Sequence, residues 1–338
     1  MLKYQITLDT ANSTMEDQLQ LWREEQLRIA SKVIIRPDQD KALSGYKYLN
    51  TKSDDEDTIP LLLGGVDVSF GENDSAIAVY VVTQDETVIY QDIIEFKLTV
   101  PYFSSYLAFR EIEPLTQLVM KQKKVKPEVT PAAILVDGNG IFHERGAGIA
   151  SFLGVRTNMK TIGVGKTLYC MDGLDHAIMG NGLEEKLDTF LTGRKNKKPD
   201  SHQNKREVVI MTESSIQPQD HCHEEIKKHD NTTRCPFKEN IQLASQYCEG
   251  FAVPIRGKSG SILAAALVGH GGKIGQRASS TKARKGGTKI PIFISIGHDI
   301  SLQEAVQICA STSYARIPES VRRADLIGRH IMRGKNMS

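Results

Sequence analysis

The amino-acid sequence predicts an α/β fold in which a mixed β-sheet is flanked by helices. Two observations lead to this prediction. Three segments rich in β-branched and aromatic residues follow one another closely between residues 61 and 98, which is typical of antiparallel strands joined by short turns. Strand-like segments then alternate with helical segments between residues 104 and 165, which favours parallel strands. We therefore expect a three-stranded antiparallel meander that continues into parallel strands.

The N-terminal part of the chain predicts a helix followed by the meander. Ser13 and Glu16 have the spacing of a capping box, and Trp22 and Ile29 are among apolar residues that recur at helical intervals, so we expect a helix over residues 13–33. The charged run at 52–60 ends in a proline and is expected to be a loop. The three meander strands are expected at residues 61–70, 76–83 and 87–98.

The alternating part of the chain follows. Apolar periodicity predicts a helix over residues 104–124, and the apolar run AAILVDG predicts a buried strand over 132–138. A short helix is expected near 146–154 and a strand near 160–165.

The second half of the chain begins with a polar stretch. Residues 182–249 lack sustained periodicity, so we expect a disordered insertion. Core-like sequence resumes at 251–269, and the loop 269–289 is basic and expected to be flexible.

The last segment combines a strand with two helices. We expect a strand at 291–297, a helix headed by the capping-box pair Ser301 and Glu304, and a final helix over 316–332.

Composition limits the classes of function. The chain has 338 residues and a net charge of +2, so attraction to a polyanion must depend on local groups. Five scattered cysteines fit a reducing compartment, and the N-terminus lacks the apolar region of a signal peptide. The longest apolar stretch of the second half, Ile262 to Val268, is too short for a membrane span of about 20 residues. We expect a monomer in the cytoplasm, the nucleus or both, including the nucleolus, that is not secreted and does not bind a membrane.

Three carboxylates are candidates for a metal site. Asp67 and Asp137 stand in apolar strands, and Glu111 is flanked by Phe109 and Ile112 on the following helix. A buried charge must be paired, hydrogen-bonded or bound to a cation, and three carboxylates suit Mg²⁺. Taken singly, each could instead be the partner of a buried salt bridge, for example with Arg110.

Lys166 and two histidines are further candidates for a polar site. The run GVGKT at 163–167 resembles the end of a phosphate-binding loop, but Lys160 stands where that motif requires glycine. We therefore expect no nucleotide cofactor. His143 and His298 lie next to strand ends, where a side chain can reach a cleft, although a lone histidine more often satisfies a backbone hydrogen bond.

Six motifs together resemble the endonuclease V family, nucleases that act at deaminated adenine. They occur in the order found in that family and are specific as a set. The motifs are GGVDVSF at 64–70, PYFSSYLAFRE at 101–111, VDGNGIFHERGAGIASFLGV at 136–155, TIGVGK at 161–166, SIGHDIS at 295–301 and RIPESVRRAD at 316–325.

The resemblance implies an RNase H-like core and a single catalytic domain over residues 1–338. It implies that Asp67, Glu111 and Asp137 bind Mg²⁺, for which Mn²⁺ can substitute, around the scissile phosphate. Lys166 and His298 would lie near that phosphate and orient water or neutralise developing charge. Two-metal chemistry would leave 5′-phosphate and 3′-hydroxyl ends.

The resemblance also implies how the substrate is held. Tyr102 matches a wedge that enters the base stack where the modified nucleotide is flipped out. The residues that match the hypoxanthine pocket are Leu107, Gly140, Gly148 and Ile149. We expect phosphate contacts from His143, Arg145, Lys282, Arg284 and Lys285.

Four residues depart from the usual pattern of the family, namely Ser105 after the wedge, Glu144, Gly165 before the lysine, and Asp299 after the histidine. The motifs look most like the animal branch, whose members favour inosine in RNA. The leading expectation is thus a metal-dependent endoribonuclease that cuts single-stranded, inosine-containing RNA at the second phosphodiester 3′ to inosine. A deoxyinosine-specific DNA repair endonuclease is the alternative, and a module that binds inosine-containing RNA without cleaving it is a third.

Overall fold

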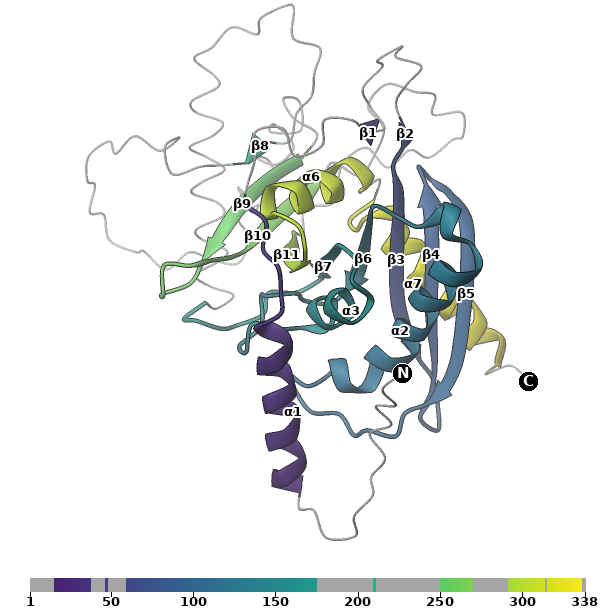
Figure 1. Cartoon of the computed structure of the whole chain (residues 1–338), viewed down its shortest axis with the longest axis horizontal. Helices are drawn as coiled ribbons and strands as arrows, with labels where there is room; N and C mark the ends of the chain where they lie inside the picture. Colours follow the sequence, from purple (N-terminus) through teal and green to yellow (C-terminus); the bar gives the residue numbers. More distant parts are fainter. Residues whose placement is uncertain are drawn as a thin grey trace, which may run out of the picture.

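The computed structural model describes residues 15–37, 46–47, 59–174, 209–210, 250–269, 291–313 and 315–335. Within these ranges, nine strands form one mixed sheet in the order β5-β4-β3-β6-β7-β11-β10-β9-β8. Helices lie on both of its faces (Figure 1). The predicted fold class is confirmed.

The meander forms one side of the sheet. Its strands are β3 (Leu62–Phe70), β4 (Ser75–Gln84) and β5 (Thr87–Lys97), and both pairings are antiparallel. Asn73, Asp74 and Asp85 adopt positive φ angles at the two connections, as tight turns require. The meander is where the sequence predicts it.

Two parallel strands continue the sheet next to β3. These are β6 (Ala133–Asp137) and β7 (Thr161–Gly165). The register pairs Val66 with Val136, so Asp67 and Asp137 follow at the same end of adjacent strands. Asp137 in turn pairs with Val164, just before Lys166. Polar side chains from three neighbouring strands thus converge at one edge of the sheet.

The far side of the sheet is antiparallel except for its last strand. Strand β11 (Ile292–His298) pairs with β7, followed by β10 (Ile262–Gly269), β9 (Gly250–Arg256) and β8 (Val209–Ile210), which runs parallel to β9. A separate parallel pair joins β1 (Tyr46–Lys47) to β2 (Ile59–Pro60). Strand β8 lies within the predicted insertion 182–249, and the rest of that stretch before Gly250 is outside the described residues.

The two faces of the sheet carry different helices. Helices α2 (Ala108–Val125) and α3 (Ile149–Thr157) cover one face, where they pack on alternate β4 residues such as Tyr80. Helix α6 (Leu302–Thr312) packs on the β10 and β11 part of the other face, and α7 (Glu319–Lys335) packs on its meander part against Ile77 and Val79. A 3₁₀ turn, η1 (Pro127–Val129), follows α2.

Helix α1 (Met15–Ala30) packs next to α3, and its Trp22 is buried. The Trp22 ring stacks on Phe109 of α2 at 5.2 Å. No helix within the described ranges is both long and apolar enough to cross a membrane.

Helix α7 packs directly on β3, with glycines at the contact. A Cβ atom on Gly65 would lie 2.2 Å from the backbone carbonyl of Ser320, and one on Gly328 would lie 2.4 Å from the Ser69 hydroxyl oxygen. Because the contact at position 65 is with backbone atoms, which cannot move aside, glycine is required there, whereas at position 328 the Ser69 side chain would have to move. This close packing brings α7 side chains over the polar end of β3.

Several predicted helix limits differ from the structure. The helix predicted over 104–124 begins at Ala108, because residues 101–107 form a loop in which Ser105 has a φ of 63°. Ser301 caps α6 as predicted, since its hydroxyl accepts a hydrogen bond from the Glu304 amide at 3.1 Å, while the Glu304 side chain pairs with Lys160. The first proposed capping residue, Ser13, lies outside the described residues.

Candidate active site

A cavity of about 440 Å³ opens at the edge of the sheet where β3 and β6 end. Asp67 of β3 and Asp137 of β6 both line it, and the Ser69 hydroxyl lies 3.5 Å from Asp67 Oδ2. Glu111 lies in the first turn of α2 and is close enough to Asp137 to feel its charge. The structure therefore brings the three predicted carboxylates to one region from three separate elements.

Lys166 and Asp325 complete the cluster. The Lys166 ammonium group donates to Asp137 Oδ2 and lies 4.0 Å from Asp325 Oδ1. Asp325, from α7, also accepts a hydrogen bond from Arg329 Nε at 2.9 Å. Lys166 and Arg329 thus contribute two positive charges to a group of carboxylates that includes the buried Asp67.

The electrostatics of the cluster show an excess of negative charge. Burial raises the pKa of Asp67 to about 8, and the charges of Asp137 and Asp325 add to the shift, while Lys166 opposes it. Burial also raises the pKa of Glu111 to about 7, with Arg110 opposing the shift and Asp137 adding to it. Burial alone would lower the pKa of Lys166, but the neighbouring carboxylates outweigh it and raise that pKa.

These residues fit a hard divalent cation. All the acidic donors are carboxylate oxygens, which Mg²⁺ and Mn²⁺ prefer. A raised carboxylate pKa means that the ionised form lacks compensating charge, which a bound cation would supply. Within the described ranges, no three candidate ligands are already arranged around one point, and the Lys166 ammonium group donates to Asp137.

Sequence reasoning did not single out Asp325 as a site residue. It lies in RIPESVRRAD and is surrounded by Arg322, Arg323 and Arg329, so it resembles one half of an ordinary helix-surface ion pair. The signal that could have found it is Ala324, which is fully buried next to it and orients this part of the helix toward the sheet.

The structure does not bring His298 to this cluster, contrary to the expectation. His298 pairs with Thr161 at the start of β7, whereas Lys166 follows the end of that strand. Because a strand rises roughly 3.3 Å per residue, about 16 Å of strand separates the two positions. His298 is buried, and its Nδ1 accepts a hydrogen bond from the Ile34 amide at 3.3 Å. Its place in the structure is that of a core histidine.

The loop 101–107 carries the predicted wedge. Tyr102 is 66% exposed, and its ring lies 5.8 Å from the Arg110 guanidinium carbon. Leu107 is partly exposed at the start of α2. Both positions leave these side chains accessible to a ligand.

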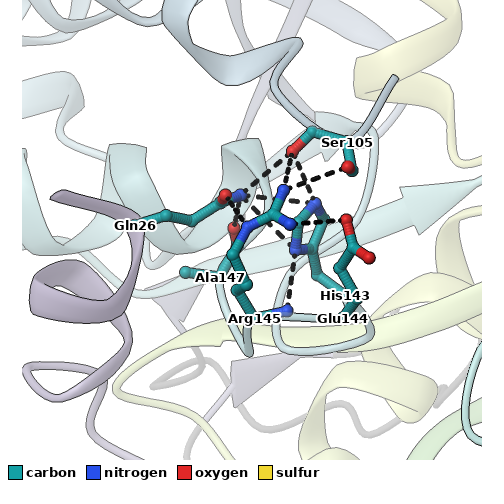
Figure 2. A network of polar contacts seen from close by, with 6 residues as sticks. All are labelled: Gln26, Ser105, His143, Glu144, Arg145 and Ala147. Atoms are coloured by element: carbon teal, nitrogen blue, oxygen red, sulfur yellow. Dashed lines mark hydrogen bonds and ion pairs between the residues drawn. The ribbon is translucent and has the colours of Figure 1, made fainter. Parts of the chain in front are cut away.

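A buried hydrogen-bond network fastens this loop to the rest of the protein (Figure 2). Arg145 donates to Gln26 Oε1 at 2.5 Å and to the Ser105 carbonyl and hydroxyl oxygens at 2.9 and 3.0 Å. His143 Nε2 donates to the same Ser105 carbonyl at 3.0 Å. Gln26 Nε2 donates to the Ala147 carbonyl at 2.7 Å.

This network changes the expected role of two residues. Burial lowers the pKa of His143 to about 4, and the Arg145 charge adds to that shift. His143 and Arg145 are turned inward and occupied by protein partners, so the structure does not present them as phosphate contacts. Lys282, Arg284 and Lys285 lie outside the described residues.

Three of the four predicted base-pocket residues, Gly140, Gly148 and Ile149, meet at the N-terminus of α3, whereas Leu107 stands at the start of α2. The Gly148 amide donates to the Gly140 carbonyl at 2.8 Å, and the Gly140 amide donates to the Ser295 hydroxyl oxygen at 2.8 Å. A Cβ atom on Gly138 would lie 2.6 Å from Ile149 Cγ2. The glycines therefore allow close backbone packing around Ile149, and the amides of Gly140 and Gly148 are already bonded within the protein.

A mixed sheet with a meander, two parallel strands and carboxylates at their common edge defines an RNase H-like nuclease. The endonuclease V family model matches residues 46–217 and 256–326. The human endonuclease V is 31% identical over 97% of this chain and 88% of its own length, and the mouse endonuclease V is 30% identical over 94% and 70%. The chain belongs to the endonuclease V family and is an endonuclease, a phosphodiesterase.

Solved structures agree with this assignment. The catalytic domain of human endonuclease V has a TM-score of 0.64 and 28% identity, covering 96% of this chain and all of that one. The endonuclease V of Ciona intestinalis, crystallised with a DNA containing an inosine followed by a ribo-adenosine, has a TM-score of 0.59 and 27% identity, covering 94% and 99%.

Proposed function

We propose that this protein is a metal-dependent endoribonuclease that cleaves inosine-containing single-stranded RNA at the second phosphodiester 3′ to inosine. The observation that carries the proposal is the cavity where Asp67, Asp137, Asp325 and Lys166 meet. Such a cluster of carboxylates beside one lysine suits hydrolysis of a phosphodiester. We expect the enzyme to act as a monomer in the cytoplasm or the nucleus.

Each residue of the cavity has a distinct role in the proposed reaction. Asp67 and Asp137 would hold Mg²⁺ or Mn²⁺ directly, with Glu111 and Asp325 as further oxygen donors or as partners of bound water. When bound, such a metal would lower the pKa of a water molecule and neutralise charge on the phosphate. Lys166, held against Asp137, would stabilise negative charge that develops on the phosphate oxygens. Attack in line with the departing 3′ oxygen would leave a 5′-phosphate and a 3′-hydroxyl.

The substrate would be positioned by the exposed loop and by the N-terminus of α3. Tyr102 would enter the base stack beside the inosine, and the flipped hypoxanthine would lie near Leu107, Gly140, Gly148 and Ile149. The cost of unstacking is a few kcal/mol, which contacts in the pocket offset.

The preference for RNA has support from a relative. The Ciona intestinalis protein was crystallised with a strand in which a ribonucleotide follows the inosine. A 2′-hydroxyl at this position is the group by which a protein distinguishes RNA from DNA. The alternative, a deoxyinosine-specific DNA repair endonuclease, would use the same cavity.

The test is cleavage of two end-labelled single strands of identical sequence, one RNA and one DNA, each with a single inosine, in Mg²⁺ or in EDTA. We expect one cut in the RNA, dependent on metal and on inosine, and a phosphatase-sensitive 5′ end on the 3′ fragment. Asp137→Asn should abolish the cut. The control variant Asp92→Asn alters an ion pair between Asp92 of β5 and Lys121 of α2 and should leave the cut unchanged. Preferential cutting of the DNA would instead establish the repair enzyme, and cutting of neither would refute the nuclease proposal.

A further inference from the structure

Two exposed aromatic rings lead from the proposed wedge loop to the carboxylate cavity. Phe70, the last residue of β3, lines the cavity and is 50% exposed, and Tyr102 is 66% exposed. The guanidinium carbon of Arg110 lies 5.6 Å from the Phe70 ring and 5.8 Å from the Tyr102 ring. The three side chains therefore form a continuous row that begins at the wedge loop and ends at the cavity.

Both rings of this row are largely open to solvent. Phe70 projects from the end of the strand, next to the polar residues of the cavity. Arg110 Nε is buried and has no hydrogen-bond partner among the described residues. A buried donor without a partner is costly in a folded protein, which suggests that a ligand completes this region.

The chemistry of the row suits an unpaired base. Flat aromatic rings and guanidinium planes are the surfaces on which single-stranded nucleic acids stack their bases. The cationic groups Lys166, Arg329 and Arg333 around the same cavity favour the phosphates that accompany such a base.

We propose that Phe70, supported by Arg110, is a stacking platform for the base of the nucleotide immediately 3′ to the inosine. This inference rests on the proposed function, since cleavage at the second 3′ phosphodiester leaves one nucleotide between the flipped inosine and the scissile phosphate. In the proposed function the inosine lies beside the Tyr102 wedge and the scissile phosphate lies in the cavity, and Phe70 is on the row that joins the wedge to the cavity. Every base has a π-face, so the platform accepts any base at this position but requires that one is present.

The test is equilibrium binding of fluorescent RNA single strands in EDTA, where the proposed metal-dependent cleavage cannot occur. The strands carry one inosine followed by either adenosine or an abasic nucleotide. For the wild-type protein, we expect the abasic strand to bind about tenfold more weakly, as loss of one base stack requires. Phe70→Leu should weaken binding of the adenosine strand by a similar factor and should show no further loss with the abasic strand.

Two variants serve as controls. Phe70→Tyr keeps a ring and should retain wild-type binding and the abasic penalty. Met120→Leu alters a side chain of similar exposure, 47%, further along α2, and should change neither. Unfolding midpoints equal to wild type show that each variant is folded.

The outcomes separate the platform from the nuclease. The platform would be overturned if Phe70→Leu bound the adenosine strand as tightly as wild type. It would also be overturned if Phe70→Leu lost affinity but still bound the abasic strand about tenfold more weakly than the adenosine strand. A wild-type protein that fails to cut the adenosine strand in Mg²⁺ but shows the expected binding pattern would refute the nuclease and leave the platform standing.

Discussion

The network around Arg145 makes a specific prediction about stability. Arg145→Lys keeps the positive charge but removes the planar group that contacts Gln26 and Ser105 at once. A lysine ammonium group on a flexible stem cannot reproduce this geometry. We therefore expect a loss of stability, accompanied by a looser 101–107 loop.

The magnitude follows from the contacts. Gln26 is 1% exposed, so its Oε1 would be left buried without a donor, at a cost of about 1 to 3 kcal/mol. Loss of the hydrogen bonds to Ser105 adds about 1 kcal/mol, and loss of the guanidinium over the Tyr106 ring at 4.1 Å adds about 0.5 kcal/mol. The ion pair with Glu144 is exposed and contributes little. The sum is about 2.5 to 4.5 kcal/mol.

Urea unfolding measures the free energy, and limited digestion with chymotrypsin reports on the loop, because Tyr102 and Phe103 are cleavage sites for that protease. Arg156→Lys is the matched control, since Arg156 pairs at 3.2 Å with the exposed Glu113, and it should cost less than about 1 kcal/mol. A change below 1 kcal/mol for Arg145→Lys, with unaltered digestion, would show that the network does not hold the loop.

Three further predictions concern the cavity and the helix above it. Because the folded pKa of Asp67 is raised to about 8, the metal-free protein should be most stable below pH 4 with respect to this group and lose stability as pH rises to 8. Urea midpoints in EDTA at pH 5 and pH 8 test this, and Asp67→Asn should reduce the difference, so equal wild-type midpoints would contradict it. Gly65→Ala places a methyl group on the Ser320 backbone and should cost at least about 2 kcal/mol, seen as a lower melting temperature; an unchanged value would exclude the close docking of α7. Asp325→Asn should slow single-turnover cleavage by roughly 100-fold while the protein stays folded, and a rate within twofold of wild type would remove Asp325 from the reaction.

Much of the fold could be predicted because local patterns agree with the final packing. The alternation around Tyr80, with one set of β4 residues toward α2 and the other toward α7, produces the apolar segment that marks a buried strand. Asp67 and Asp137 could be found because a carboxylate in an apolar strand must be paired, hydrogen-bonded or bound to a cation. Each of these signals lies within a few residues of the position it describes.

The rest depended on long-range contacts that no local pattern encodes. Asp325 joins the cavity only because glycines let α7 lie directly on β3. His298 was misplaced because strand direction decides which end of β7 it reaches, and β11 runs antiparallel to β7. Arg145 was expected to meet phosphate, whereas its partners Gln26 and Ser105 lie far away in the sequence.

The docking of α7 on β3 also bears on the order in which the protein becomes competent. Chains emerge from the ribosome N-terminus first, so Asp67, Glu111 and Asp137 are exposed long before Asp325 is made. The cavity cannot close until the last described helix has been synthesised and has settled against the sheet. For an enzyme with the proposed activity on RNA, this order of synthesis leaves the nascent chain without a complete set of acidic groups until α7 has been made.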